Sequence, residues 1–189
     1  MSDYVQIVIL CEDRQQEVFA RQFLIGCGIH QRRIRVNICP RGRGSGEQYV
    51  RQEYARETRL YCSRSAYLTI GLVVMIDADV MSANERFDQL EGALVSAQQP
   101  RRRPDERIAI FVPKRNVETW ICYLQGETVN EADVYPSLSR EGDCRPLVQR
   151  LAHKPVYRLT HDVPPSLQAA CAELRRIFPA KQCVLEGEA

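Results

Sequence analysis

Short apolar runs alternate with helical stripes along the chain. The apolar runs have the length and the β-branched content of strands, and they lie at Tyr4–Leu10, Arg33–Ile38, Leu68–Ile76 and Arg107–Val112. Leu68–Ile76 is the most apolar of the four. We therefore expect it to be the central strand of a sheet, buried on both faces.

Helices are predicted between and after these strands, because apolar side chains there recur every three or four residues. The stripes comprise Val18–Leu24, Val50 with Tyr54 in the charged segment Gln48–Leu60, Phe87–Ala97, Val117–Leu124 and Leu167–Phe178. Ser82 and Glu85 have the spacing of a capping box, which marks the start of the helix through Phe87. Gly126–Pro164 is poorly patterned, and no element is predicted in it.

The repeated order of strand and helix predicts an α/β fold. We expect a three-layer sandwich with a mostly parallel central sheet and right-handed crossovers. A length of 189 residues suits one domain. That domain is expected to span 1–180, with its core in 4–125, a C-terminal extension over 126–180 and a loose tail at 181–189.

Composition excludes several classes of protein. The chain is 44% hydrophobic and 26% charged, as in a globular protein rather than a disordered one. Its apolar stretches, such as Leu72–Ile76, are far shorter than the roughly 20 residues that span a bilayer, so no membrane contact is expected. Met1-Ser2-Asp3 leads directly into the first apolar run without a signal peptide, which predicts a cytoplasmic protein. Eight cysteines without a CxxC pair or finger spacing do not favour structural zinc.

Basic residues are nearly all arginines, and they are unevenly spread. Nine arginines and three glutamates lie between His30 and Arg64, and Arg101–Arg103 form a second basic group. The planar guanidinium suits phosphate groups, so a nucleic-acid track is one interpretation. A solvated surface, or the codon bias of a GC-rich genome, is the other.

Acidic residues follow three of the predicted strands. Glu12 and Asp13 follow the first strand, Asp77 and Asp79 the central strand, and Glu118, with Lys114 and Arg115, the fourth. Ligands of open parallel sheets bind beyond the carboxyl ends of the strands. The sequence therefore predicts an acidic site at that edge.

The motif Asp77-Ala78-Asp79 is the sharpest element of this site. If the backbone stays extended, its two carboxylates project to the same side. Carboxylates that close repel one another and require a proton or a cation, and Mg²⁺ or Mn²⁺ prefers oxygen ligands. The alternative is a pair of turn or capping aspartates before the helix near Asn84.

Three segments resemble motifs of TOPRIM domains. Val8–Glu12 with the helix after it looks like their first motif, an apolar strand followed by a glutamate, and Val73–Asp79 looks like their second, a strand ending in DxD. Val112–Trp120 resembles a stretch of small TOPRIM-like proteins related to prokaryotic defence nucleases. The resemblance covers roughly residues 4–125. One departure is Asp13, which stands where a glycine commonly follows the glutamate.

The resemblance implies a TOPRIM/Rossmann-like fold and a Mg²⁺- or Mn²⁺-dependent nuclease of antiviral defence. It implies that Glu12, Asp77 and Asp79 bind the metal, that Glu12 also acts as general acid or base, and that Glu118 is a further acid beside the metal. No tyrosine can be assigned as a nucleophile, so water is the expected one.

Basic residues complete the predicted mechanism. Lys114 or Arg115 would stabilise charge on the scissile phosphate, or would be plain exposed cations at the start of a helix. Arg41 and Arg43, on a loop with three glycines, would bind the nucleic-acid backbone.

Two alternatives stay open. TOPRIM-like domains also act as non-catalytic binding or regulatory subunits, here one that would dock on a larger ATPase. Ile76–Val80 also resembles the nucleophile motif of haloacid-dehalogenase-like phosphatases, although in that family the motif usually ends the first strand.

Overall fold

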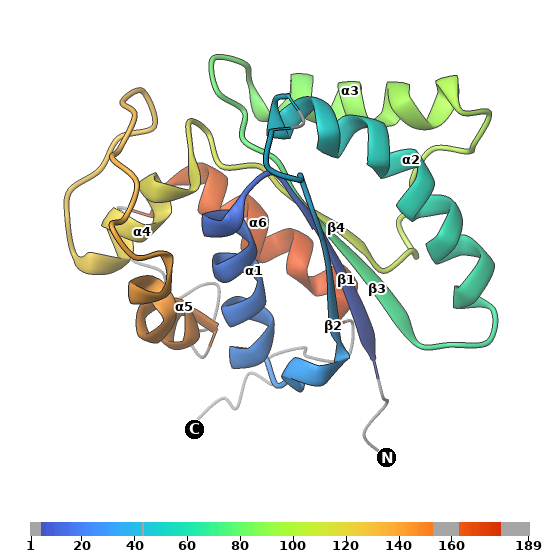
Figure 1. The fold of residues 1–189 in the computed structure, drawn as a ribbon, viewed down its shortest axis with the longest axis horizontal. Coiled ribbons are helices and arrows are strands. Elements are labelled where there is room, and N and C mark those ends of the chain that lie inside the picture. The colour runs from blue at the N-terminus through green and yellow to red at the C-terminus, as the bar shows by residue number, and fades with distance from the viewer. Residues whose placement is uncertain (1–4, 43, 153–162, 179–189) are drawn as a thin grey trace, which may run out of the picture.

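The computed structural model describes residues 5–42, 44–152 and 163–178, and it has three layers (Figure 1). The central layer is a sheet of four strands, β1 (Gln6–Cys11), β2 (Ile34–Ile38), β3 (Ile70–Met75) and β4 (Ile108–Phe111). The strand order is β2-β1-β3-β4, and every neighbouring pair is parallel. The predicted α/β sandwich is confirmed, and its sheet is parallel throughout rather than mostly.

β1 and β3 are the inner strands of this sheet. Ile9 lies opposite Val36 of β2 on one side and Val73 of β3 on the other. All six residues of β3 are buried, as predicted for a central strand. The apolar side chains of β3 alternate between the two faces and so hold both helical layers.

Helices cover both faces of the sheet (Figure 1). They are α1 (Arg14–Gly26), α2 (Gly46–Ser65), α3 (Ala83–Ser96), α4 (Val117–Gln125), α5 (Arg145–Ala152) and α6 (Pro165–Ile177), with short 3₁₀ helices η1 (Gln31–Arg33) and η2 (Glu141–Cys144). α2 and α3 bury one apolar cluster, around Tyr54 and Leu90. α1, α4, α5 and α6 bury the other, which includes Phe19 and Trp120.

Two helices differ from the sequence prediction. α2 begins at Gly46 rather than Gln48, because the Ser45 hydroxyl accepts the amide N–H of Gln48 at 3.1 Å and caps the helix there. α5 lies in the segment in which no element was predicted. Its core residues Val148 and Leu151 are buried. A helix of eight residues is marginal alone, so packing on α1 stabilises it.

The edge of β4 is covered by charged side chains. The Glu173 carboxylate of α6 accepts the Ile110 amide N–H at 2.9 Å, and Arg102 donates to the Ile108 carbonyl at 2.9 Å. Arg102 and Glu173 also form an ion pair. An uncovered strand edge is a template for pairing with another chain. These contacts use backbone groups that would otherwise be open to such pairing.

The tail expected at 181–189 lies outside the described residues. So does part of the C-terminal extension expected over 126–180. Across the described ranges, no helix combines the length and the apolar character needed to cross a membrane.

Candidate metal site at the carboxyl edge of the sheet

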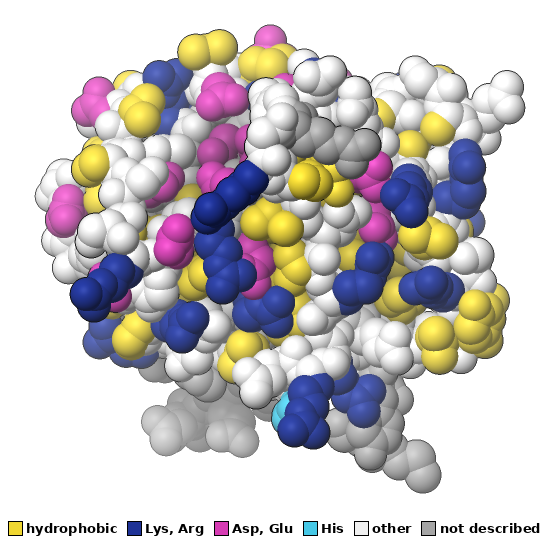
Figure 2. Space-filling view, in the orientation of Figure 1, with side chains coloured by type: hydrophobic (Ala, Val, Ile, Leu, Met, Phe, Trp, Pro, Cys, Tyr) yellow, Lys and Arg dark blue, Asp and Glu magenta, His cyan; other side chains and the backbone are white. Residues whose placement is uncertain are grey.

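Acidic residues from three segments lie where the parallel strands end. Glu12 follows β1 directly, Asp77 follows β3 by two residues, and Glu118 lies in the first turn of α4. Figure 2 shows acidic side chains in the upper part of this face, where Figure 1 places the carboxyl ends of the strands. The first turns of α1 to α4 begin at this same edge, and helix N-termini favour negative charge.

Hydrogen bonds connect Glu12 to the loop after β3. Its Oε1 accepts the amide N–H of Asp77 at 2.6 Å. Its own amide donates to Oε1 of the buried Gln16 at 3.0 Å. Asp13 caps α1 by accepting the Gln16 amide at 2.8 Å, which fixes the turn between β1 and α1. The side chain of Glu12 is therefore held against the end of β3.

Glu12 and Asp77 have strongly perturbed acidities. Burial raises the pKa of Glu12 to about 7, although the hydrogen bonds from Asp77 and Gln16 oppose the shift. Burial also raises the pKa of Asp77 well above its usual range, and the negative charge of Glu12 raises it further. Within the described residues, the buried Oδ1 of Asp77 has no hydrogen-bond partner. Such a pair favours a bound proton or cation.

The DxD motif is not extended, so the condition for two carboxylates on one side is not met, and Asp79 lies in a turn, as in the alternative interpretation. β3 ends at Met75, and the Met81 amide donates to the Ala78 carbonyl at 2.9 Å. Asp79 lies in the resulting turn with φ of 54°, a left-handed conformation that aspartate tolerates. Its carboxylate lies 3.1 Å from Nη2 of Arg86. Asp79 still raises the pKa of both Glu12 and Asp77 by its charge.

Arg86 is a site residue that the sequence analysis missed. It is only 3% exposed, and its Nε donates to the Asp77 carbonyl at 2.8 Å. It also forms an ion pair with Glu47 of α2, so it ties the DxD loop to two helices. Its position four residues before Leu90 places it on the buried stripe of α3. A buried arginine needs hydrogen-bond or charged partners. An arginine on the predicted apolar stripe of this helix was therefore the sequence signal that could have identified Arg86 as a site residue.

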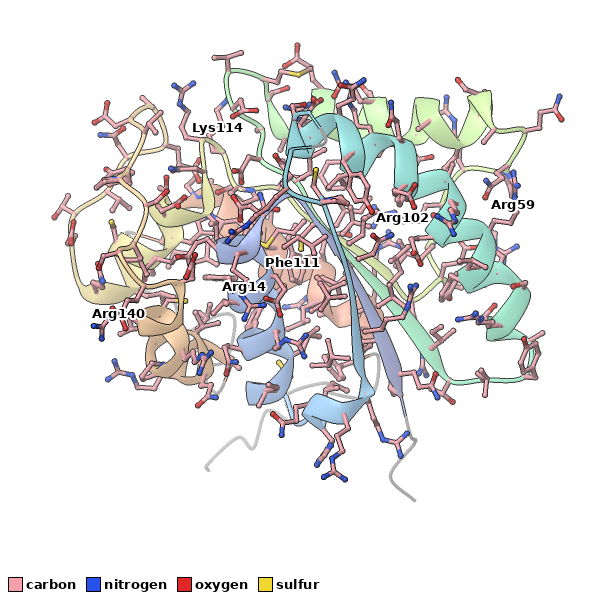
Figure 3. The ribbon with its side chains drawn as sticks, in the orientation of Figure 1. Arg14, Arg59, Arg102, Phe111, Lys114 and Arg140 are labelled. Carbon is pink, nitrogen blue, oxygen red and sulfur yellow. The ribbon has the colours of Figure 1, made fainter. Side chains whose placement is uncertain are left out.

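The residues after β4 contact the DxD loop and the acidic cluster. Lys114 donates to the Met81 carbonyl, and Arg115 donates to the Asp79 carbonyl at 3.0 Å. Figure 3 shows Lys114 at the upper edge of the molecule. Glu118 accepts the Ser137 hydroxyl at 2.8 Å, and burial raises its pKa. The charge of Glu118 also raises the pKa of Asp77, so the structure brings this third acid into electrostatic contact with Asp77.

The basic loop before α2 leads directly to Glu12. Arg41 is exposed in it, and Arg43 lies outside the described residues. Gly46, the first residue of α2, packs on Glu12 so closely that an added methyl group would lie 2.7 Å from the Glu12 Cβ. Only glycine allows this approach. Arg41 is therefore on a loop that ends at the acidic cluster.

The donor atoms suit a hard divalent cation. In the described parts of the chain, no three His, Cys, Asp or Glu side chains already converge as a metal-binding group. Asp77 nevertheless offers a buried oxygen without a partner, and Glu12 lies beside it. Oxygen donors of this kind are those that Mg²⁺ and Mn²⁺ take. For Asp79 to become a third ligand, its carboxylate would have to break its ion pair with Arg86.

Comparisons with known proteins add no evidence about the site. Protein-family models, curated proteins and solved structures give no significant match to this chain. The TOPRIM resemblance rests on the three short motifs and stays a prediction.

Proposed function

We propose that the chain is a metal-dependent nuclease that hydrolyses phosphodiester bonds in nucleic acid. One observation carries the proposal. The Glu12 carboxylate contacts the backbone of Asp77, whose own buried oxygen has no partner among the described residues. Two acids from separate strands thus meet where a proton or a cation is favoured.

Glu12, Asp77 and Asp79 would hold the Mg²⁺ or Mn²⁺ ion, with Glu118 beside them. Bound there, a divalent cation would lower the pKa of an attacking water and stabilise charge on the phosphate. Glu12 would also accept a proton: burial raises its pKa to about 7 in the metal-free protein, and a bound divalent cation would lower that pKa and keep the carboxylate ionised. The backbone N–H of Asp77 and the side-chain amide of Gln16 both donate to Oε1 of Glu12, which leaves Oε2 to take the proton of the water.

Basic side chains support phosphate binding at this edge. Arg115 contacts the backbone of Asp79, and Lys114 contacts that of Met81, so two positive charges lie on the DxD loop. Arg41 is exposed on the loop that ends at Glu12. Positive charge beside an acidic metal site attracts the backbone of nucleic acid without regard to sequence.

A non-catalytic binding or regulatory role is the second candidate, and one observation favours it. Arg86 is buried and already neutralises Asp79, so one of the three acids has a cation partner. In this role the chain would bind nucleic acid and act through a larger ATPase subunit.

Cleavage by the purified chain distinguishes the two roles. Plasmid DNA, single-stranded DNA and RNA are incubated with Mg²⁺ or Mn²⁺, and with EDTA as the metal-free control. We expect cleavage that needs the metal and is lost in Asp77→Asn. Asp88→Asn, which changes an exposed acid of α3, is the matched control and should cut normally. Salt-sensitive binding without cleavage, alone or with an ATPase, would establish the second role instead.

A further inference from the structure

A basic cavity lies at the opposite edge of the sheet from the acidic cluster. It has a volume of about 750 Å³ and opens at the amino ends of β1, β2 and β3. Its basic lining residues come from η1, the start of β2 and the end of α2, and they are His30, Arg32, Arg33, Arg35 and Arg64. Ile7 and Ile34 are among the apolar residues that line it. Figure 2 shows basic side chains at the lower edge, where Figure 1 places the start of β2.

Positive charge is in excess in this cavity. None of the described residues that line it is an aspartate or a glutamate. Arg35 is paired with Glu57 at 2.6 Å from outside the lining. Arg32 is exposed and Arg64 is half-buried. Arg64 also lies in the last turn of α2, where a cation offsets the helix dipole.

The size and lining of the cavity indicate the class of ligand. Its volume lies within the range of about 300–1,000 Å³ that is typical of small-molecule sites. One guanidinium group can bind two phosphate oxygens at once, and the volume leaves room for a nucleoside beside the phosphates. We propose that the cavity binds the phosphate groups of a nucleotide, either free or at the end of a nucleic-acid strand.

This site is separate from the acidic one. β1 runs from one edge to the other. Its residues 6–8 line the cavity and Glu12 follows its last residue, which leaves about 13 Å of extended chain between Val8 and Glu12, and Arg32 lies further away, before the start of β2. A phosphate bound by Arg32 cannot therefore be the phosphate beside Glu12. The proposal does not depend on nuclease activity, and it can be tested without metal.

Calorimetric titration with ADP in EDTA tests the cavity. We expect ADP to bind, and Arg32→Glu with Arg64→Glu to weaken the affinity by at least about tenfold. Arg140→Glu is the matched control, because Arg140 is exposed and Figure 3 places it on the side of the molecule that carries α5. Arg32→Gln alone, at an exposed position, should weaken binding severalfold and serves if the double variant does not fold.

A second titration identifies the source of the phosphate. A fluorescent single strand of about 12 nucleotides is titrated under the same conditions, so that its salt dependence can be measured. Binding of ADP alone supports a free nucleotide, and binding of the strand alone, sensitive to Arg32→Gln, supports a strand end. Absence of both, or equal weakening by Arg140→Glu, overturns the proposal and leaves the metal-dependent cleavage experiment unaffected.

Discussion

Two clusters of half-buried charge at the sheet differ in how fully their polar atoms are used. Beside β4, the Glu173 carboxylate accepts the Ile110 amide and the Nε–H of Arg176 at 3.3 Å, and it pairs with Arg102. At the carboxyl edge, the pKa values of Glu12 and Asp77 are raised, and one oxygen of Asp77 is buried without a partner among the described residues.

This difference separates a structural charge from a functional one. A carboxylate whose partners are all in place holds two elements together and leaves nothing for a ligand. Buried acids that lack partners reduce stability, and such perturbed groups cluster at functional sites. Burial of charge alone would not have distinguished Glu173 from Asp77, whereas hydrogen-bond satisfaction does.

The largest expected effect is on cleavage. Glu12→Gln should lower the rate by about 100- to 10,000-fold, because an amide cannot take the proton of the attacking water. Glu173→Gln should leave the rate per folded molecule unchanged, since Glu173 lies at β4 and not at the carboxyl edge. Single-turnover cleavage with both variants measures this contrast. Equal losses in the two variants would remove the distinction between the clusters.

The free energy of unfolding should show the opposite order, with the larger effect at Glu173 and the smaller one at the carboxyl edge. Glu173→Gln is expected to lower the free energy of unfolding by about 3 kcal/mol, because it leaves the nearly buried Arg102 without its charge partner. Asp77→Asn should leave that free energy unchanged or raise it, since it removes a buried charge. Urea unfolding in EDTA compares them, and strong destabilisation by Asp77→Asn would mean that this carboxylate is structural.

Stability should also depend on pH through the acidic cluster. Glu12 binds its proton more tightly in the folded state, where its pKa is about 7, than in the unfolded state, where it is near 4.5. The metal-free protein is therefore expected to lose up to about 3 kcal/mol of stability as the pH rises from about 4.5 to 7. The double variant Glu12→Gln with Asp77→Asn should show a flatter profile.

Thermal unfolding in EDTA across this pH range gives the comparison between wild type and double variant. Identical profiles would show that neither acid is held with a raised pKa. Mg²⁺ or Mn²⁺ affinity, measured by calorimetry, should rise over the same range as the carboxylates lose their protons.

The smallest expected effect concerns the basic loop. Arg41→Ala should weaken nucleic-acid binding severalfold and reduce the slope of affinity against salt by about one, because one phosphate contact is lost. Arg140→Ala, another exposed arginine, is the control. A salt slope that Arg41→Ala does not alter would exclude the loop from the nucleic-acid interface.

Much of the fold was predictable because its signals are local. Within the described residues, the four strands, the Ser82 capping box and every α-helix except α5 follow from apolar spacing within short segments. α5 was not predictable, because its short stripe is stabilised by distant contacts such as Gln149 with Gln22 at 2.8 Å. The choice between an extended and a turned DxD backbone was not predictable for the same reason, since the turn through Asp79 is held by Arg86 and Arg115.

The sequence by itself determined which acids lie at one edge, because parallel strands must end on the same side of a sheet and Glu12 and Asp77 each follow a strand. Only the tertiary structure decided how those acids are used. The close approach of Gly46 to Glu12, the burial of Arg86 and the unpartnered oxygen of Asp77 each depend on residues far apart in the chain. Acidity and hydrogen-bond satisfaction arise from such surroundings, and no spacing rule along the sequence contains them.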